Sequence, residues 1–216
     1  MKKKSNCITY IMAGILVISL LPSCAYEYLT EDGIHNPKVN MTTYDYLRTE
    51  RFSNFDTLVM LIDNLGMKEE VNAAGTVLAI TDYSIGRSMR ANWTLDSLFT
   101  YTTRDSLRNY LFDPVTTLES LDVESNIIES KGGKRFDLHK ELQTQFQYTQ
   151  WTTQPVYRLR VFRIVGESDF EMGIPIDQIP VNERDRSNYV QTSNISTTTG
   201  TVHILENLHY LNFNFQ

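Results

Sequence analysis

The clearest periodic pattern in the chain is an apolar stripe between Phe55 and Leu65. Apolar residues recur there at offsets of 0, 3, 4, 7 and 10, which places them on one face of an α-helix. Ser53 precedes the stripe as a capping residue, and Asp56 follows three positions later as a variant of the capping box. Gly66 stands where a helix C-terminal cap is expected. The pattern predicts an amphipathic helix that opens at Ser53 and ends before Gly66.

Shorter helical patterns lie on either side of this helix. One begins at Thr42, with Asp45 three residues on, and another is capped by Thr94. Helical spacing continues over residues 107–111 and is predicted to end at Asp113-Pro114, because the residue before a proline is disfavoured in the α conformation. The apolar positions that share a face in the later segments are Leu95, Leu98 and Phe99, and then Leu107, Tyr110 and Leu111.

Strand patterns dominate the second half of the chain. Residues 157–164 alternate between apolar and arginine side chains, and Phe162 and Ile164 on the arginine side predict that this face is partly covered. Residues 166–188 are rich in Pro, Gly and charge and are expected to form a long loop. The other expected features are strands at Thr76–Ile80, Thr201–Leu205 and Leu211–Phe215 and a turn at Gly132-Gly133.

The order of these elements predicts the fold class. Helices early and strands late are typical of an α+β domain, with the early helices packed on a late β-sandwich or wedge. The chain has 216 residues, of which 41% are hydrophobic and 11% aromatic, so it can bury a core of useful size.

The N-terminal residues have a different character. Lys2–Lys4 precede an apolar run from Ile8 to Leu21, which is shorter than the roughly 20 residues that a membrane-spanning helix needs. The run ends in Leu21-Pro22-Ser23-Cys24, which resembles the bacterial lipobox, although Pro22 is an unusual occupant. The resemblance implies cleavage before Cys24 and lipidation of that cysteine; a retained anchor, or cleavage elsewhere, is the alternative. We expect a signal peptide at 1–23, a lipidated Cys24 with a flexible tether at 24–40, and a folded domain at 41–216.

Cysteine content and charge argue against several classes of function. The two cysteines are Cys7 and Cys24, so loss of the leader would leave no thiol for a disulfide, a thiolate catalyst or a cysteine metal site. The formal net charge is −6, and removal of the three leader lysines lowers it to −9. An acidic chain has no electrostatic reason to bind nucleic acid. It also gains nothing from anionic lipid, so membrane attachment would rest on the acyl chains.

Two stretches of the predicted domain carry a family resemblance. Gly75–Ile85 resembles the first signature of fasciclin domains, in which a strand ending in Thr-Val-Phe-Ala-Pro-Thr leads into Asn or Asp and a short helix. Thr199–Leu205 resembles the second, in which Asn-Gly, an apolar pair, His and another apolar pair form the last strand. The resemblance covers roughly Met41 to Phe215. The matching residues are Thr76, Val77, Ala79, Thr81 and Asp82 in the first signature and Gly200 and His203 in the second.

The chain also departs from the family's pattern. Ile80 stands where the family usually has proline, and Asn109–Phe112 lacks the histidine of the Tyr-His pair that follows the family's middle helix. An adhesion function that maps to that pair is therefore not implied. The stretch 174–186 is longer than in a minimal fasciclin domain. Together with Asn182–Arg186 and Asn207–His209, it resembles the lipid-anchored fasciclin-like proteins of Bacteroidetes.

The resemblance implies a function and a location. It implies an outer-membrane lipoprotein displayed at the cell surface, whose domain mediates adhesion or binds an extracellular polysaccharide or protein without catalysis and without a cofactor. The alternative is an accessory subunit of an outer-membrane glycan-uptake complex, whose partner would be an outer-membrane transporter. Acidic residues soon after Cys24 resemble the surface-export signal of some Bacteroidetes lipoproteins, and an ordinary polar linker is the alternative.

Patterns typical of enzymes and metal sites are missing from the sequence. There is no Gly-x-Ser-x-Gly elbow, phosphate-cradling glycine loop or dinucleotide fingerprint. His203 and His209, with Glu206 between them, would lie about 20 Å apart on a strand and on different sides of a helix, so we expect no metal site. His203 is expected to be a structural residue of the last strand, whereas His139 and the pair Glu69-Glu70 are expected to be solvated.

Aromatic and arginine side chains are the candidates for ligand contacts. Tyr148 and Trp151 lie in a Gln-rich run that is expected to be exposed, and together with Tyr157 they could stack on sugar rings. Core packing is the alternative for each aromatic residue. Arg184 and Arg186 could contact a partner or form an internal salt-bridge network.

Overall fold

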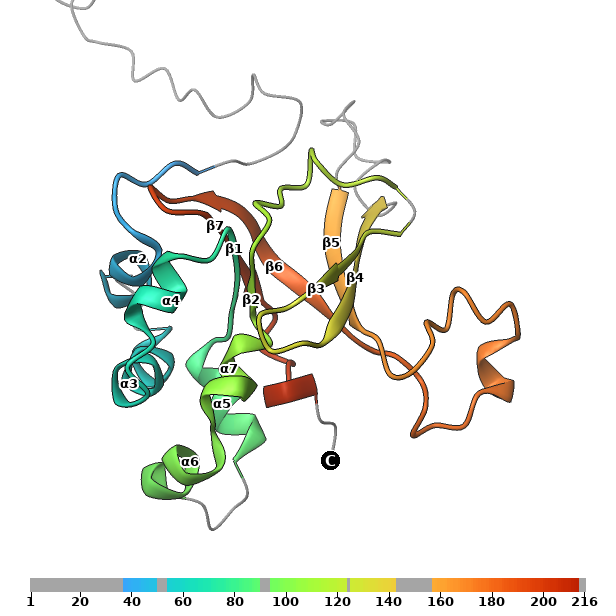
Figure 1. The fold of residues 1–216 in the computed structure, drawn as a ribbon, viewed down its shortest axis with the longest axis horizontal. Helices are drawn as coiled ribbons and strands as arrows, with labels where there is room; N and C mark the ends of the chain where they lie inside the picture. The colour runs from blue at the N-terminus through green and yellow to red at the C-terminus, as the bar shows by residue number, and fades with distance from the viewer. Residues whose placement is uncertain (1–36, 50–53, 90–93, 124, 143–156, 214–216) are drawn as a thin grey trace, which may run out of the picture. The chain divides into compact units, whose positions relative to one another are not determined.

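The computed structural model describes residues 37–49, 54–89, 94–123, 125–142 and 157–213. All of them fall in one compact unit, Gly33–Gln216. Figure 1 shows the elements in order along the chain. The helices are α2 (Thr43–Thr49), α3 (Asp56–Asn64), α4 (Lys68–Asn72), α5 (Asp82–Ser88), α6 (Leu95–Tyr101), α7 (Arg104–Arg108), η2 (Ile176–Gln178) and η3 (Leu211–Phe213). The strands are β1 (Thr76–Ala79), β2 (Leu111–Phe112), β3 (Ile127–Glu129), β4 (Arg135–Leu142), β5 (Tyr157–Arg163), β6 (Arg186–Ser196) and β7 (Thr201–Leu205).

The strands form one mixed sheet in the order β2-β1-β7-β6-β5-β4-β3. Of the neighbouring pairs, β1 and β7 run parallel and the others are antiparallel. The two ends of the sheet approach each other, because Phe112 bridges to Ser130 and the N–H of Lys131 donates to the carbonyl of Leu111 over 2.8 Å. The sheet is therefore nearly closed. The α+β class is confirmed, and the expected sandwich or wedge takes the form of one curled sheet.

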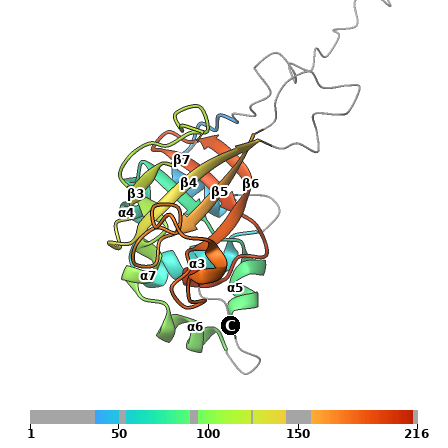
Figure 2. The ribbon, with the colours of Figure 1, turned by 90° about the vertical axis from the view of Figure 1, so that its right-hand side faces the viewer.

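The core lies between the inner face of this sheet and the early helices. It joins apolar residues of α2, α3 and α4 to those of β1, β4, β5 and β7 in one cluster. Figure 1 shows α2, α3 and α4 beside β1 and β7, and Figure 2 shows β4, β5 and β6 side by side with α5, α6 and α7 below them. Phe136 links the halves of the core, since its ring centre lies 5.3 Å from that of Phe112 and 5.4 Å from that of Phe213.

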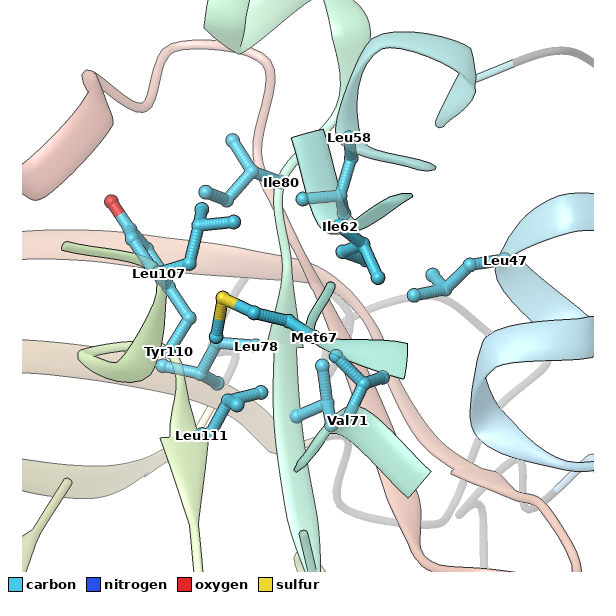
Figure 3. A pocket seen from close by; sticks show the side chains of 11 residues that line it. Leu47, Leu58, Ile62, Met67, Val71, Leu78, Ile80, Leu107, Tyr110 and Leu111 are labelled. Carbon is cyan, nitrogen blue, oxygen red and sulfur yellow. The ribbon is translucent and has the colours of Figure 1, made fainter. Parts of the chain in front are cut away.

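A small apolar cavity of about 20 Å³ remains between the helices and the sheet. Figure 3 shows its lining side chains converging from separate elements, among them Leu47, Met67 and Leu78, while the hydroxyl of Tyr110 points away from it. The space is about that of one water-sized sphere and offers no polar partners, so a water would gain nothing there. It is a packing gap rather than a ligand site.

Helix α3 is capped by a residue distant in the sequence. No side-chain cap comes from its own N-cap residue, so the predicted capping box around Asp56 is wrong. Instead, the N–H of Thr57 donates to Oδ1 of Asp82 over 2.8 Å. At the other end, Gly66 has φ +62°, a left-handed conformation in which a glycine costs little, so the predicted C-terminal cap is confirmed. The helix therefore depends on the start of α5 for its own beginning.

Two other predicted elements are wrong. Residues 111–112 form β2 rather than the end of a helix, because Leu111 pairs with Val77 of β1. Residues 211–213 form the short helix η3 rather than a strand, since Asn212 and Phe213 have φ values of 60° and 56° that no extended strand adopts. The sequence pattern also does not indicate α4, which lies between α3 and β1.

Strand β6 is not apparent in the sequence. It is polar over most of its length, and its register against β7 shifts twice between Val190 and Ile195. Asn194 lies within this irregular region at φ 62°, a conformation that Asn tolerates better than most residues. Polar composition and bulges hide the period of two that identifies a strand. The predicted long loop consequently ends at Asp185, and β6 begins at Arg186 rather than after Asn188.

Candidate functional site: a groove where β5 and β6 part

A surface groove of about 370 Å³ opens where β5 and β6 separate. The ladder between the two strands ends at Arg160 opposite Tyr189. Beyond that point β5 stays paired with β4, whereas β6 follows β7 from Val190 onward. The two strands thus diverge as a fork, and the groove occupies the opening. Its lining consists of Tyr157, Arg158, Leu159, Val190, Gln191, Ser193 and Glu206.

An ion pair lies in the groove. Arg158 of β5 pairs with Glu206, the residue after β7, and their side chains are 29% and 25% exposed. The guanidinium carbon of Arg158 lies 3.7 Å from the ring centre of Tyr189, and the N–H of Glu206 donates to the carbonyl of Tyr189 over 2.9 Å. Both charged groups are therefore held in place and still reach solvent. The groove presents hydrogen-bond donors beside acceptors with no net charge from this pair.

A second arginine supports the same tyrosine. The guanidinium carbon of Arg160 lies 5.0 Å from the ring centre of Tyr189 and 4.6 Å from that of Phe162. Arg160 also donates to Ser187 Oγ over 2.9 Å and pairs with Glu141 at 3.4 Å. Tyr189 therefore contacts the guanidinium groups of both Arg158 and Arg160, and these contacts restrain Arg158 in the groove.

The threonines of the fasciclin-like signature bind backbone groups rather than line the groove. The hydroxyl of Thr76 donates to the carbonyl of Pro114 over 2.7 Å and accepts from the N–H of Thr116 over 2.8 Å. The hydroxyl of Thr81 accepts from the N–H of Ser84 and so caps α5. These contacts hold β1 to the segment after β2 and start the helix that follows β1.

The remaining signature residues are packed inside the domain. Val77 and Ala79 are buried in β1, and Asp82 caps α3 as described above. A Cβ atom on Gly200 would lie 2.6 Å from the carbonyl oxygen of Ala74, so only glycine fits where the chain enters β7. The signature residues therefore build the frame of β1 and β7.

His203 is fully buried in β7. Its Nδ1 accepts from the N–H of Asn194 at 3.2 Å, so its Nε2 carries the proton and donates to the carbonyl of Thr116 over 2.9 Å. Burial lowers its pKa to about 4. The ring is therefore neutral near pH 7, and both of its nitrogens are occupied by backbone partners. It has no free atom with which to bind a ligand or a metal.

His139, expected to be solvated, is packed in a cluster. Its side chain is 14% exposed and its Nε2 lies 2.8 Å from Oδ2 of the buried Asp137. Its ring centre lies 4.7 Å from that of Phe162 and 4.6 Å from that of Phe170. Burial alone would raise the pKa of Asp137, but hydrogen bonds from His139, Ser125 and the N–H of Asn126 outweigh it and lower that pKa. The sequence predicts that the arginine face of β5 is partly covered, and the structure confirms it. The hydrogen bond between His139 and Asp137 is not apparent in the sequence.

In the acid pair, Glu69 is exposed as expected, whereas Glu70 differs from expectation. Glu70 is bonded rather than simply solvated: it pairs with Arg104 and accepts from Nε of Arg108 over 2.8 Å. Hydrogen bonding to Arg108 is the largest effect on this carboxyl and lowers its pKa. The pair ties α4 to α7.

The arginines predicted as ligand contacts lie away from the groove. Nε of Arg184 donates to the carbonyl of Ile179 over 2.8 Å, and Arg186 lies opposite Arg163 at the start of β6. Among the sequence candidates that the structure describes, Tyr157 lines the groove. Sequence reasoning did not select Arg158 or Glu206, because only the pairing of β5, β6 and β7 brings them together. The candidates Tyr148, Trp151 and Cys24, and the predicted cap Ser53, lie outside the described residues.

The segment 166–185 projects from the sheet between β5 and β6 (Figure 1). Asp185 accepts from the N–H of Asp169 over 3.0 Å, and Asp169 accepts from the N–H of Asp185 over 2.9 Å, so the base of the segment is closed. Burial raises the pKa of the Asp185 carboxyl. Four large apolar side chains remain exposed on this projecting segment: Phe170, Ile174, Ile176 and Val181.

Among the described residues, no three His, Cys, Asp or Glu side chains gather so that they could hold a metal ion. In the same part of the chain, no helix is long and apolar enough to cross a membrane.

The structure defines an α+β domain with a polar surface groove, which can be compared with known proteins. No protein-family profile matches the chain, and no curated protein matches it. Among solved structures it is similar to a FAS1 domain pair from the insect cell adhesion molecule fasciclin I, with 12% sequence identity and a TM-score of 0.46. The likeness covers 76% of this chain and 47% of that chain, so this chain spans about half the length of that structure.

Proposed function

We propose that this chain is a lipid-anchored cell-surface protein whose fasciclin-like domain binds an extracellular polysaccharide or protein without catalysis. The observation that carries the proposal is the groove between β5 and β6, an open concavity with fixed donors and acceptors. The fasciclin-like assignment is supported by the position of the two signatures. Thr76 pairs with Thr201 and Leu78 with His203, so stretches far apart in the sequence form one parallel strand pair.

The chemistry of the groove favours binding over catalysis. Among the described residues that line it, one is a carboxylate, Glu206, whereas hydrolysis of glycosides uses a pair of carboxyl groups on either side of the bond. The same described residues include one aliphatic hydroxyl, on Ser193, and no histidine to activate it. Glu206 is also engaged in the ion pair with Arg158.

Anchoring is proposed from the lipobox-like stretch at Cys24. The described chain enters the domain at Pro37–Val39, where the N–H of Val39 donates to the carbonyl of Ser196 over 2.8 Å and the N–H of Ser196 donates to the carbonyl of Pro37 over 2.8 Å. At up to ~3.5 Å per residue, the stretch from Cys24 to Pro37 could span about 45 Å. That reach is enough to hold a domain clear of lipid headgroups.

Protease treatment of intact cells tests the surface location. The native protein should be degraded in intact cells, and a Cys24→Ala variant should leave the membrane fraction. A periplasmic protein of known location serves as the control for cell integrity. Protection of the native protein until lysis would contradict surface display, and an unchanged membrane association of Cys24→Ala would contradict the anchor.

A second candidate function is that of an accessory subunit of an outer-membrane complex. The projecting segment 166–185 favours it, because exposed apolar side chains on a segment closed at its base suit contact with another protein. An Ile176→Asp variant should then lose co-purification with a transporter from membranes. Tyr83→Asp changes an equally exposed side chain on α5 and should retain it.

A further inference from the structure

The geometry of the groove points to a neutral, hydroxyl-rich glycan as its ligand, held by Arg158 and Glu206 together. This inference rests on the proposed binding function and names the ligand class and the residues that contact it. It starts from the ion pair in the lining, its partial exposure, and the apolar and amide side chains around it.

The two charged groups have complementary hydrogen-bonding roles. The guanidinium of Arg158 carries five N–H donors and no acceptor, and the ionised carboxylate of Glu206 only accepts. Neighbouring hydroxyls of a sugar ring each donate and accept. One hydroxyl can therefore accept from Arg158 while the next donates to Glu206, and both hydrogen bonds are strengthened by the charge on the protein side.

The pairing of these groups selects against charged ligands. An anionic ligand would have to draw Arg158 away from Glu206, which would leave a carboxylate without its partner in a groove where it is 25% exposed. A cationic ligand would have to displace Arg158 in the same way. A neutral ligand uses the free donors and acceptors and leaves the ion pair intact.

The rest of the lining suits a sugar ring. The partly exposed ring of Tyr157 offers apolar surface for the C–H face of a sugar, whereas Leu159 and Val190 are almost fully buried and close the floor of the groove. Gln191 and Ser193 offer further hydrogen bonds. Small-molecule sites usually measure about 300–1,000 Å³, and a groove of about 370 Å³ lies at the small end of that range. It can hold a short stretch of a glycan chain that continues into solvent at the open side.

Recognition of this kind needs little ordering of the protein. Arg158 is stacked on Tyr189 and bonded to Glu206 before any ligand arrives. The entropy cost of fixing a long side chain on binding is therefore largely avoided.

The test is calorimetric titration of the full-length protein in a detergent without a sugar headgroup. The probes are hexasaccharides of glucose, mannose and xylose, together with oligogalacturonate of the same length as the anionic comparison. At least one neutral probe should bind with a Kd that changes by less than about twofold between about 50 and about 500 mM NaCl. Salt screens contacts between a charged ligand and the protein more strongly than it weakens the binding of a neutral ligand. Oligogalacturonate should bind at least about tenfold more weakly.

Variants locate the binding site. Arg158→Met and Glu206→Gln should each weaken binding of the neutral probe by about tenfold or more, a loss equal to about 1.4 kcal/mol. Gln191→Ala, at an exposed position whose change leaves the fold intact, should weaken it by at least about threefold. Arg135→Met is the matched control, because Arg135 pairs with Glu171 at 3.8 Å outside the groove, and it should bind as the native protein does.

Each contrary result has one meaning. Tighter and salt-sensitive binding of oligogalacturonate would overturn the choice of a neutral ligand. Neutral binding that survives all three groove variants would place the ligand elsewhere, which defeats the inference but keeps the proposed function. Failure of every neutral probe would defeat the inference, and the proposed function would then stand or fall on the protease test and on binding of an extracellular protein.

Discussion

The hydroxyl of Tyr110 lies 2.8 Å from Nε2 of His209, 99 residues away in the sequence. The same hydroxyl accepts from the N–H of Asn212 over 2.6 Å, so it must donate its proton to His209. The stretch Asn109–Phe112 lacks the histidine that follows tyrosine in fasciclin domains, and here a histidine from the end of the chain contacts the tyrosine in space. The contact fixes the C-terminal segment against the segment between α7 and β2.

Removal of this hydroxyl should destabilise the domain. In Tyr110→Phe, the buried Nε2 of His209 and the N–H of Asn212 both lose their partner, and an unsatisfied buried group costs about 1–3 kcal/mol. Urea unfolding measures the change in the free energy of unfolding. Tyr83→Phe, at a side chain that is 61% exposed, should change it by less than about 0.5 kcal/mol. Equal effects of the two variants would show that the Tyr110–His209 contact adds nothing to stability.

The buried histidines should also make stability depend on pH. Burial lowers the pKa of His203 to about 4 and that of His209 to about 3, whereas both titrate near 6.5 in the unfolded chain. The unfolded state therefore binds more protons between these values, and stability is complete above pH 6.5 and falls as the pH drops through this window. From pH 7 to pH 5 the loss should be about 2 kcal/mol for each histidine.

A variant isolates the histidine contribution. His203→Gln should reduce the slope of unfolding free energy against pH, whatever its effect on stability at pH 7, because Asp137 and Asp185 titrate alike in both proteins. Urea midpoints at pH 7, 6 and 5 give the two slopes. Parallel slopes for the native protein and the variant would mean that His203 binds a proton as readily in the folded state as in the unfolded state.

The sequence predicts the parts of the fold that repeat a pattern locally. Local patterns in the sequence identify β1, β5, β7 and the helix that ends before Gly66. Their apolar residues recur with a clear period or form a short apolar run. β6 was missed since it is polar and bulged at Asn194. The candidate site depends more strongly than the fold does on contacts between segments that are distant in the sequence. Arg158 and Glu206 meet only because β6 leaves β5 after Tyr189 and follows β7, and no local pattern encodes that separation.

The close approach of two backbone segments at the start of β7 gives a steric prediction. Gly200→Ala would place its Cβ 2.6 Å from the carbonyl oxygen of Ala74 and 2.7 Å from that of Gly75, so one backbone segment must shift. Overpacking of this kind costs about 1–3 kcal/mol. Gly86→Ala is the control, since its Cβ would meet nothing within 4 Å in α5, and there alanine should stabilise by about 0.5–1 kcal/mol. Thermal unfolding of both variants should therefore move Tm in opposite directions.

The long-range cap on α3 offers the sharpest test of how the fasciclin-like signature stabilises the domain. Asp82 accepts from the N–H of Thr57, and the N–H of Asp82 donates to the carbonyl of Asn54 over 2.8 Å. Asp82→Ala removes only the side-chain contact and should lower the free energy of unfolding by about 0.5–2 kcal/mol, as the loss of an N-cap does. Asp82→Asn keeps an oxygen acceptor and should recover most of that loss. If Asn and Ala are equally destabilising, the charge of Asp82 near the start of α3, rather than its hydrogen bond to Thr57, is what holds the helix in place.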